Sequence, residues 1–402
     1  MEPELIFLVT GEAGAGKDFC ADVWAKVLDK YLKVRVTSIS HEFKCQYAKQ
    51  SGADLQLLLN DRAYKEKHRP MMNEFLQKQI LTHPQLFDET LVNAVHGTKN
   101  ELVDVLFITG MREEAPVAAL SHMVPDSRVI EVYVHANRSV LEERRKNRKI
   151  DDGTSGGGGN IGTSSTMLPT LNYTPTLIFD NSVGGDVKAK GFVMSRLHPF
   201  LSSRDLRKLA SMVRLAPDFP RQSINFHHVL GIAQQQGGLQ LCVRLIRDQF
   251  AGEWKDEGAI ACCEAGGVIF ASALATSIPS IPLVLIREAG KLVPPTVSVV
   301  KPASYISSSA AGESGKKTIE LERDAVRSVI QNGTSVMVVD DLLATGTTLC
   351  ATLELLQKAG ISSDKTTVMV VVELPEHRAR EAIVKKGFGK VKIQSLLVYS
   401  GH

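Results

Sequence analysis

The sequence lacks the patterns that assign a chain to several specialised classes of protein. Its six cysteines stand singly or as one adjacent pair inside apolar segments, without the C-x-x-C spacing of a metal site. It has no run of eighteen apolar residues, and its N-terminal segment lacks the basic start and cleavage site of a signal peptide. We therefore expect reduced core thiols, no membrane span and a cytoplasmic location.

Charge of one sign is also scarce. The 47 Lys and Arg residues against 44 Asp and Glu residues leave a net charge of +3, with no long basic run and no strongly acidic tail. This balance gives no argument for nucleic acid or a membrane surface as partner, so small molecules are the expected ligands. The 402 residues suffice for two or three domains, and no internal repeat is visible.

The most specific stretch is VVDDLLATGTT, residues 338–348. The apolar residues 336–339 predict a buried parallel strand that ends in Asp340 and Asp341, before a turn that opens a helix near Leu349. Such a turn presents backbone N–H groups at a helix N-terminus and binds phosphate monoesters. The carboxylates can hold ribose hydroxyls or a magnesium-bound diphosphate. The alternative is an ordinary strand-turn-helix connection with charged residues at its edge. That interpretation leaves the desolvation cost of two carboxylates without a compensating ligand.

This stretch resembles the diphosphate-sugar motif of type I phosphoribosyltransferases, and Leu342 to Thr345 make it most similar to the adenine phosphoribosyltransferases. Thr347 stands where that family has glycine. The resemblance extends over about residues 204–402 and implies 5-phosphoribosyl 1-diphosphate (PRPP), a purine base and Mg²⁺ as ligands, and a homodimer. The residues implied to bind the 5'-phosphate are Ala344, Thr345, Gly346, Thr347 and Thr348.

Other stretches match the same family in part. Glu264 and Ala265 match, but Gly266 replaces an arginine expected to touch diphosphate, so restoring arginine there is expected to raise the rate. Glu288 replaces a lysine. Residues 305–315 are interpreted either as a working lid over the site or as a serine-rich surface loop, and the two interpretations have equal support. The implied base-binding residues are Asn225, Phe226 and His227, and the implied catalytic residues are Asp340, Asp341, Arg287, Lys291 and Glu313.

The N-terminal half carries a second phosphate signal. The apolar run Leu5 to Thr10 precedes G-x-x-x-x-G-K, and a helical pattern follows, which predicts an ATP-binding loop rather than a glycine turn with a solvated lysine. The expected ATP-binding residues are Gly11, Ala13, Gly14, Ala15, Gly16, Lys17 and Asp18. Asp18 occupies the position of the usual magnesium-binding hydroxyl, so the candidate metal ligands are Asp18, Asp340 and Asp341.

The sequence Gly16-Lys17-Asp18-Phe19 resembles animal-type phosphomevalonate kinases, which are nucleoside monophosphate kinase-like, over about residues 3–197. The resemblance implies residues that bind the phosphate acceptor and residues of a lid that closes over the transferring phosphates. The alternative for the lid arginines is an ordinary charged helix exposed to solvent. These residues are Lys44, Lys65, Arg69 and Arg112 for the acceptor, and Arg144, Arg145 and Arg148 for the lid. Residues 110–113 depart from the family's Asp-Thr-Arg-Arg signature, so ATP binding is better supported than phosphorylation of phosphomevalonate.

The predicted architecture is α/β, with two doubly wound parallel-sheet domains: a kinase-like domain at 1–198, a linker at 199–206 and a transferase domain at 207–402. The predicted function is formation of AMP and diphosphate from adenine and PRPP, fused to an ATP-binding domain. Two alternatives stay open. One is a non-catalytic sensor of PRPP or nucleotides, and the other is a kinase as the main activity.

Overall fold

The computed structural model describes residues 2–83, 85–97, 102–111, 115–150, 171–219, 222, 224–302 and 317–400. The chain forms two compact units, and neither is one continuous segment. The first unit holds Met1–Pro116, Val129–Thr170 and Leu177–Leu197, and the second holds Val117–Arg128, Leu171–Thr176 and His198–His402. The predicted linker at 199–206 is occupied by the short turn His198–Leu201 and the first half of α9.

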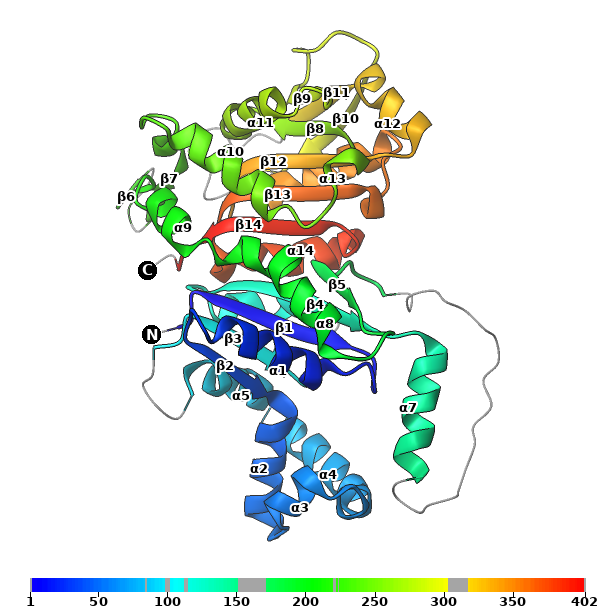
Figure 1. The fold of residues 1–402 in the computed structure, drawn as a ribbon. Coiled ribbons are helices and arrows are strands. Elements are labelled where there is room, and N and C mark those ends of the chain that lie inside the picture. The colour runs from blue at the N-terminus through cyan, green and yellow to red at the C-terminus, as the bar shows by residue number, and fades with distance from the viewer. Residues whose placement is uncertain are drawn as a thin grey trace. The chain divides into compact units, whose positions relative to one another are not determined.

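The first unit is built on a five-stranded sheet in the order β2-β3-β1-β4-β5, whose recorded strand pairs are parallel (Figure 1). Its strands are β1 (Leu5–Gly11), β2 (Val34–Ser38), β3 (Val105–Thr109), β4 (Arg128–His135) and β5 (Leu177–Asp180). Its helices are α1 (Lys17–Leu28), α2 (Ile39–Ser51), α3 (Leu55–Asn60), α4 (Arg62–Thr82), α5 (Leu86–His96), α7 (Arg138–Ile150) and α8 (Asp186–Phe192).

The strands β1 and β3 of this sheet are mainly apolar, as expected for strands covered on both faces. Every residue of β3 is buried, and β1 is buried as far as Thr10. Trp24 of α1 fills the core beside the sheet, with ring centroids 5.5 Å from Phe179 and 5.4 Å from Phe192. These contacts therefore fix α1, the helix that follows the glycine loop, against the sheet.

The second unit has a seven-stranded sheet in the order β10-β11-β9-β8-β12-β13-β14. Its strands are β8 (Glu257–Cys263), β9 (Leu283–Glu288), β10 (Thr296–Lys301), β11 (Lys317–Glu322), β12 (Ser335–Leu343), β13 (Thr366–Glu373) and β14 (Lys392–Val398). A separate antiparallel pair is formed by β6 (Arg214–Ala216) and β7 (Phe226–His228). Its helices are α6 (Pro116–Leu120), α9 (Ser203–Ala210), α10 (Gly238–Gln249), α11 (Gly266–Ser277), α12 (Arg327–Asn332), α13 (Thr347–Lys358) and α14 (Ala379–Ile383).

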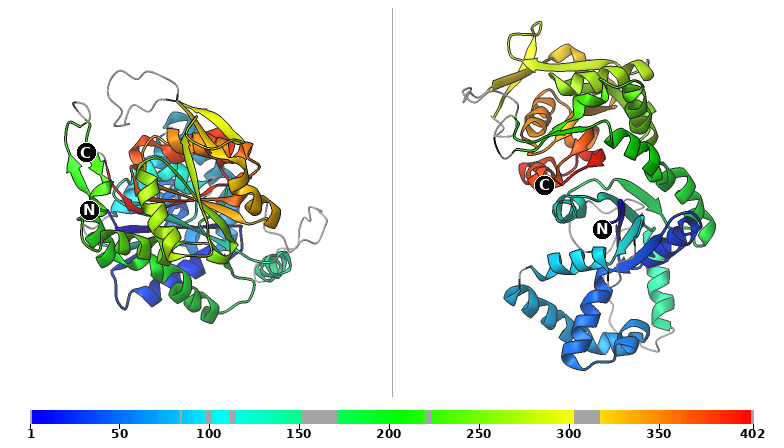
Figure 2. Two further views of the ribbon diagram at one scale, coloured as in Figure 1. Left: turned by 90° about the horizontal axis from the view of Figure 1, so that it is seen from above. Right: turned by 90° about the vertical axis from the view of Figure 1, so that its left-hand side faces the viewer.

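Helices cover both faces of this sheet (Figures 1 and 2). Alternate residues of β8 face opposite layers: Ala259 and Ala261 lie in the cluster with α12 to α14, whereas Ile260 and Cys262 lie in the cluster with α9 to α11. The prediction of two doubly wound parallel sheets is confirmed. The edge adds one feature, because β11 runs antiparallel to both β9 and β10.

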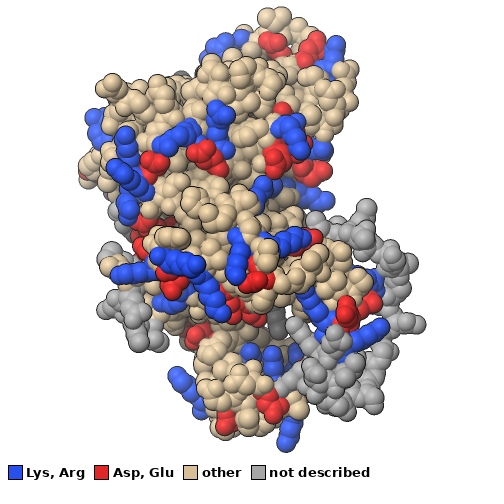
Figure 3. All heavy atoms as spheres, viewed as in Figure 1, with Lys and Arg blue, Asp and Glu red and all other residues tan. Residues whose placement is uncertain are grey.

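Surface charge and hydropathy agree with the composition. On the face drawn in Figure 3, basic and acidic side chains are interspersed over the described part of each unit. Among the helices of the described residues, none combines the length and apolar character needed to cross a bilayer.

Candidate functional site

The acidic pair stands at the carboxyl end of β12, between β8 and β13. Asp340 Oδ1 accepts a hydrogen bond of 3.0 Å from the backbone N–H of Asp341. Both carboxylates face the first turn of α11, since a Cβ atom on Gly267 would lie 3.0 Å from Asp340 Oδ1 and one on Gly266 would lie 2.2 Å from Asp341 Oδ2. The pair is thus held under the N-terminus of a helix, where negative charge is favoured.

Burial sets the protonation behaviour of this pair. Burial first, and the neighbouring carboxylate second, raise the pKa of Asp340 well above its usual range. Burial also raises the pKa of Asp341. Two carboxylates without a cation between them resist ionising together, so the arrangement favours a cationic or hydroxyl-bearing ligand.

The predicted phosphate cup forms directly after β12. Gly346 caps α13 in the left-handed conformation, with φ of 74°, and the turn brings the hydroxyls of Thr345 and Thr347 within 3.0 Å of each other. Ala379 closes one side, because a Cβ atom on Gly346 would lie 3.2 Å from the Ala379 Cβ. Thr347 therefore begins the helix without disturbing the turn, and the first N–H groups of α13 provide an anion site.

The cations predicted to bind diphosphate are brought together, but each already has a carboxylate partner. Arg287 forms an ion pair with Glu264. Lys291 lies 3.7 Å from Glu264 and 3.1 Å from Glu288, and Glu288 also pairs with Lys317 at 2.9 Å. Glu288 thus takes up positive charge on this side of the site. Glu313, the predicted proton-transfer residue, lies outside the described residues.

The predicted base-binding residues divide between two faces of β7. Phe226 packs edge-on against Phe219, with centroids 5.1 Å apart, and lies 6.4 Å from the ring of His228. His227 is only 7% exposed and stacks on Tyr399 at 4.8 Å. Burial lowers the pKa of His227. Asn225 directly precedes the strand.

The His227 side chain, which the sequence predicts to bind the base, therefore does not lie on the face of β7 that carries Phe226. The His228 side chain lies on that face. The strand's two-residue period was the signal that could have identified His228, since residues 226 and 228 of an extended segment point the same way.

The glycine loop of the first unit has the predicted strand-loop-helix form. Gly14 and Gly16 have φ of 92° and 91°, in the region that favours glycine. Lys17 Nζ donates to the carbonyls of Gly11 at 2.8 Å and Glu12 at 2.9 Å, so its ammonium lies inside the loop. The loop is preformed around a cation.

Arg144, predicted as a lid residue, lies against this loop. Its guanidinium donates to the carbonyls of Gly14 and Ala15 at 3.2 Å each and to that of Asn181 at 2.8 Å. The Asn181 amide donates to the same Ala15 carbonyl at 2.7 Å. Arg144 and Asn181 together hold the carbonyl side of the loop. The side chains of Arg145 and Arg148 lie outside the part of the chain that is described.

The predicted acceptor residues are only partly assembled. Burial and then the neighbouring ammonium of Lys65 lower the pKa of Lys44, while Asp18 opposes this shift, so these three groups form one cluster. Arg69 pairs with Glu66 on α4, with its side chain 50% exposed. Arg112 is outside the described residues.

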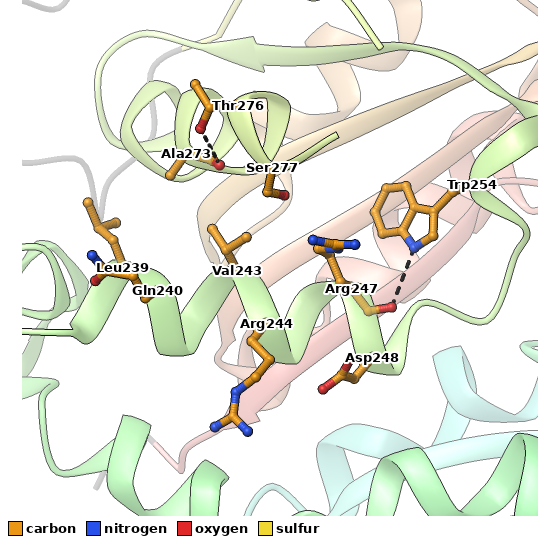
Figure 4. A pocket seen from close by; sticks show the side chains of 10 residues that line it. All are labelled: Leu239, Gln240, Val243, Arg244, Arg247, Asp248, Trp254, Ala273, Thr276 and Ser277. Atoms are coloured by element: carbon orange, nitrogen blue, oxygen red, sulfur yellow. Dashed lines mark hydrogen bonds between the residues drawn. The ribbon is translucent and has the colours of Figure 1, made fainter. Parts of the chain in front are cut away.

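A groove of about 860 Å³ lies between α10 and α11 (Figure 4). Trp254 stands at one end, where its indole N–H donates to the Arg247 carbonyl at 3.4 Å. None of the predicted site residues lines it. Its lining residues are Leu239, Gln240, Val243, Arg244, Arg247, Asp248, Trp254, Ala273, Thr276 and Ser277.

Comparison with known proteins gives a match for each half of the chain. Residues 9–126 match the family model described as "Phosphomevalonate kinase", and residues 228–395 match the one described as "Phosphoribosyl transferase domain". The chain is 35% identical over 160 residues to an adenine phosphoribosyltransferase of Bifidobacterium animalis subsp. lactis, covering 40% of this chain and 76% of that protein.

The protein of the same name from Cricetulus griseus is 32% identical over 200 residues, which cover 50% of this chain and 99% of that protein. Among solved structures, the adenine phosphoribosyltransferase of Thermoanaerobacter pseudethanolicus aligns with a TM-score of 0.40 at 28% identity. That alignment covers 48% of this chain and 99% of the other.

Proposed function

Since the chain belongs to the adenine phosphoribosyltransferase family, we propose that this phosphoribosyltransferase forms AMP and diphosphate from adenine and PRPP. The second unit carries the activity. A role in purine salvage follows from these substrates.

One observation supports the proposal most strongly: a half-buried acidic pair is followed within a few residues by a phosphate cup. Asp340 and Asp341 lie near the carboxyl end of β12, which closes at Leu343, and Gly346 caps the N-terminus of α13. The carboxylates suit the ribose hydroxyls, and the helix N-terminus suits the 5'-phosphate. A phosphoribosyl group has these two features at the two ends of one small molecule.

The donor set also fits Mg²⁺. No cluster of three or more metal-binding side chains occurs among the described residues. Magnesium is commonly held by one or two carboxylates together with substrate phosphates and water. Asp340 and Asp341 would hold it, and the ion would neutralise charge on the diphosphate.

In the reaction, N9 of adenine attacks C1' of the ribose while the bond from C1' to the diphosphate oxygen breaks. The bonding electrons leave with diphosphate, and the N9 proton of the base is released to solvent. Phe226 stacks on the base. Arg287 and Lys291 release Glu264, bind the departing diphosphate instead and neutralise its charge. Preplaced charge of this kind usually supplies the largest share of catalysis.

The test is to incubate the whole protein with PRPP, Mg²⁺ and each purine base, and to detect nucleotide by mass. AMP formed with adenine, in amounts that exceed the protein, supports the proposal. No nucleotide from any base, together with no PRPP binding by calorimetry, would reject it.

A second candidate is a sensor that binds PRPP or AMP without turnover. The observation in its favour is that Glu264 and Glu288 already engage the cations on the diphosphate side. Binding without nucleotide formation in the same experiment would identify it.

For the first unit we propose ATP binding, on the support of the preformed loop around Lys17. A kinase as the main activity is the third candidate, and phosphate transfer from ATP to phosphomevalonate or a nucleotide would identify it. We further propose that residues 199–206 link the kinase-like part of the chain to the transferase part. We also propose a homodimer formed through the second unit. Light scattering on the whole chain tests whether the protein is a dimer.

A further inference from the structure

The edge strand β10 ends in a lysine that the sequence motifs do not include. In the antiparallel pair, Lys301 is the register partner of Lys317, which in turn pairs with Glu288 at 2.9 Å. Lys301 is partly buried, and no ion pair involves it within the described ranges. It therefore adds a cation to the carboxyl edge of the sheet without a fixed carboxylate partner there.

The position of β10 along α13 shows where this lysine lies. Val297 and Val299 share one buried core cluster with Leu349 and Leu353, so the strand packs along the helix. Lys358, the last residue of α13, donates to the Ser298 carbonyl at 2.9 Å.

From Ser298 the strand advances about 10 Å to reach Lys301, at roughly 3.3 Å per residue. A helix covers that distance in about six or seven residues. If β10 runs toward the helix N-terminus, Lys301 stands near the level of Thr352. The Thr352 hydroxyl lies 3.1 Å from the Sγ of Cys263, the residue before Glu264.

The strand pairing decides that direction. Because β11 is antiparallel to both β9 and β10, β10 runs parallel to β9, which is parallel to β8, and β8 is parallel to β12. The carboxyl end of β10, with Lys301, therefore lies at the edge of the sheet that carries the acidic pair, where α13 begins. The charge of Lys301 also opposes the rise that burial causes in the pKa of the Cys263 thiol, which agrees with this placement.

The same edge of the sheet carries the acidic pair and the turn at Glu264, which follows β8. The turn itself offers no cation, because a side chain on Gly266 would meet the Asp341 carboxylate. Arg287 and Lys291 are tied to Glu264.

We propose that Lys301 binds the diphosphate of the phosphoribosyl diphosphate substrate, as a substrate-binding residue contributed by the edge strand. This inference rests on the proposed function of the same site. Lys301 supplies the positive charge that position 266 has no room to supply.

The test is calorimetry on the full chain with Mg²⁺, using inorganic diphosphate, PRPP and AMP as separate ligands. Removing one charged hydrogen-bond donor to a phosphate is expected to weaken binding by about tenfold or more. We expect this loss for diphosphate and PRPP in Lys301→Gln, and a change of less than about twofold for AMP, which carries no diphosphate. Lys301→Arg should retain most of the affinity.

The matched control is Lys255→Gln, which removes an exposed lysine at the opposite end of β8. Intact AMP binding in Lys301→Gln shows that the variant is folded. The inference is overturned if the unmodified protein binds PRPP and Lys301→Gln binds it equally well, or if AMP loses as much affinity as PRPP. If the unmodified protein binds none of the three ligands, the proposed function fails and the inference fails with it.

Discussion

Gly266 and Asp341 stand so close that a Cβ atom on the glycine would lie 2.2 Å from Oδ2 and 2.4 Å from Cγ of the aspartate. Any side chain at 266 must therefore displace that carboxylate. The sequence alone predicts that an arginine at 266 raises the rate, and the geometry reverses this expectation.

We expect Gly266→Ala and Gly266→Arg to weaken Mg²⁺-dependent PRPP binding by about tenfold, because the shifted Asp341 loses a charged contact. Calorimetry on the full chain measures this. Gly191→Ala is the matched control, since a Cβ atom there meets nothing within 4 Å. Faster turnover in Gly266→Arg would contradict the expectation.

The acidic pair should couple stability and ligand binding in opposite directions. Because burial and mutual repulsion raise the pKa of Asp340, its protonated form is favoured in the folded state, and that stabilisation is lost as pH rises through the raised pKa. Asp340→Asn should then unfold at higher temperature than the unmodified protein at alkaline pH, yet bind PRPP with Mg²⁺ more weakly.

In the unmodified protein, affinity for PRPP with Mg²⁺ should increase with pH over the same range, since the ion requires ionised carboxylates. Calorimetry at several pH values measures this. An affinity independent of pH, or an Asp340→Asn variant that binds normally, would count against the acidic pair as the ribose and metal site.

Phe226 should contribute more to the binding of the base than to the binding of PRPP. Aromatic pairs contribute roughly 0.5 to 1.5 kcal/mol beyond burial, so Phe226→Ala should raise the apparent constant for adenine several-fold and leave that for PRPP nearly unchanged. Steady-state kinetics with each substrate varied in turn measures both. Phe226→Leu separates loss of the ring from loss of bulk. Equal effects on the two constants would show a structural role instead.

The glycine loop of the first unit should depend on Lys17 and Arg144 in different ways. Lys17→Ala should weaken ATP binding directly, because it removes the ammonium inside the loop. Arg144→Gln should weaken it as well, by releasing the Gly14 and Ala15 carbonyls.

The matched control for both is Arg138→Gln on the same helix, where the arginine side chain is 45% exposed in an ion pair with Glu142. Fluorescence titration of the full chain with ATP measures the three variants. If Arg144→Gln binds ATP like Arg138→Gln, the contacts of Arg144 are dispensable for the loop.

Glu257 gives a prediction about pH and stability that is independent of the sites. It is 7% exposed at the start of β8, and burial raises its pKa from 4.5 to about 7. Its Oε1 accepts from the Thr367 hydroxyl at 3.2 Å, while its Oε2 has no hydrogen-bond partner among the described residues.

A carboxyl with a raised pKa stabilises the fold fully below its unfolded value and loses that contribution as pH rises to about 7. A shift of this size corresponds to at most about 3 kcal/mol. Glu257→Gln should match the unmodified protein near pH 4.5 and exceed it at pH 8.5. Hydrogen exchange in peptides from β8 and β13 measures the difference within the second unit. A variant of lower stability at pH 8.5 would contradict this account.

The sequence predicts well what neighbouring residues determine. The glycine loop and the phosphate cup are each one strand, one turn and one helix, so their residues reach the site by local geometry alone. The sequence does not predict which side chains arrive from elsewhere. Arg144 reaches the carbonyls of the glycine loop from α7, and Lys301 comes to the carboxyl edge of the second sheet on an edge strand with no motif of its own.

The direction in which the β7 side chains point could not be predicted from the sequence, for a different reason. A three-residue strand of one phenylalanine and two histidines has too little apolar contrast to show which residues point inward. Tyr399, far along the chain, selects His227 for the core.

The discontinuous second unit has a consequence for synthesis on the ribosome. Its first piece, Val117–Arg128, emerges roughly 270 residues before the end of the unit. At about 5 to 20 residues per second, that piece waits about 14 to 55 s until the unit is complete. Leu120 and Val124, each 2% exposed in the folded protein, face water or a chaperone during that interval. The nascent chain is therefore most vulnerable to aggregation after the first unit is complete, and slowing elongation beyond residue 198 should lengthen that period.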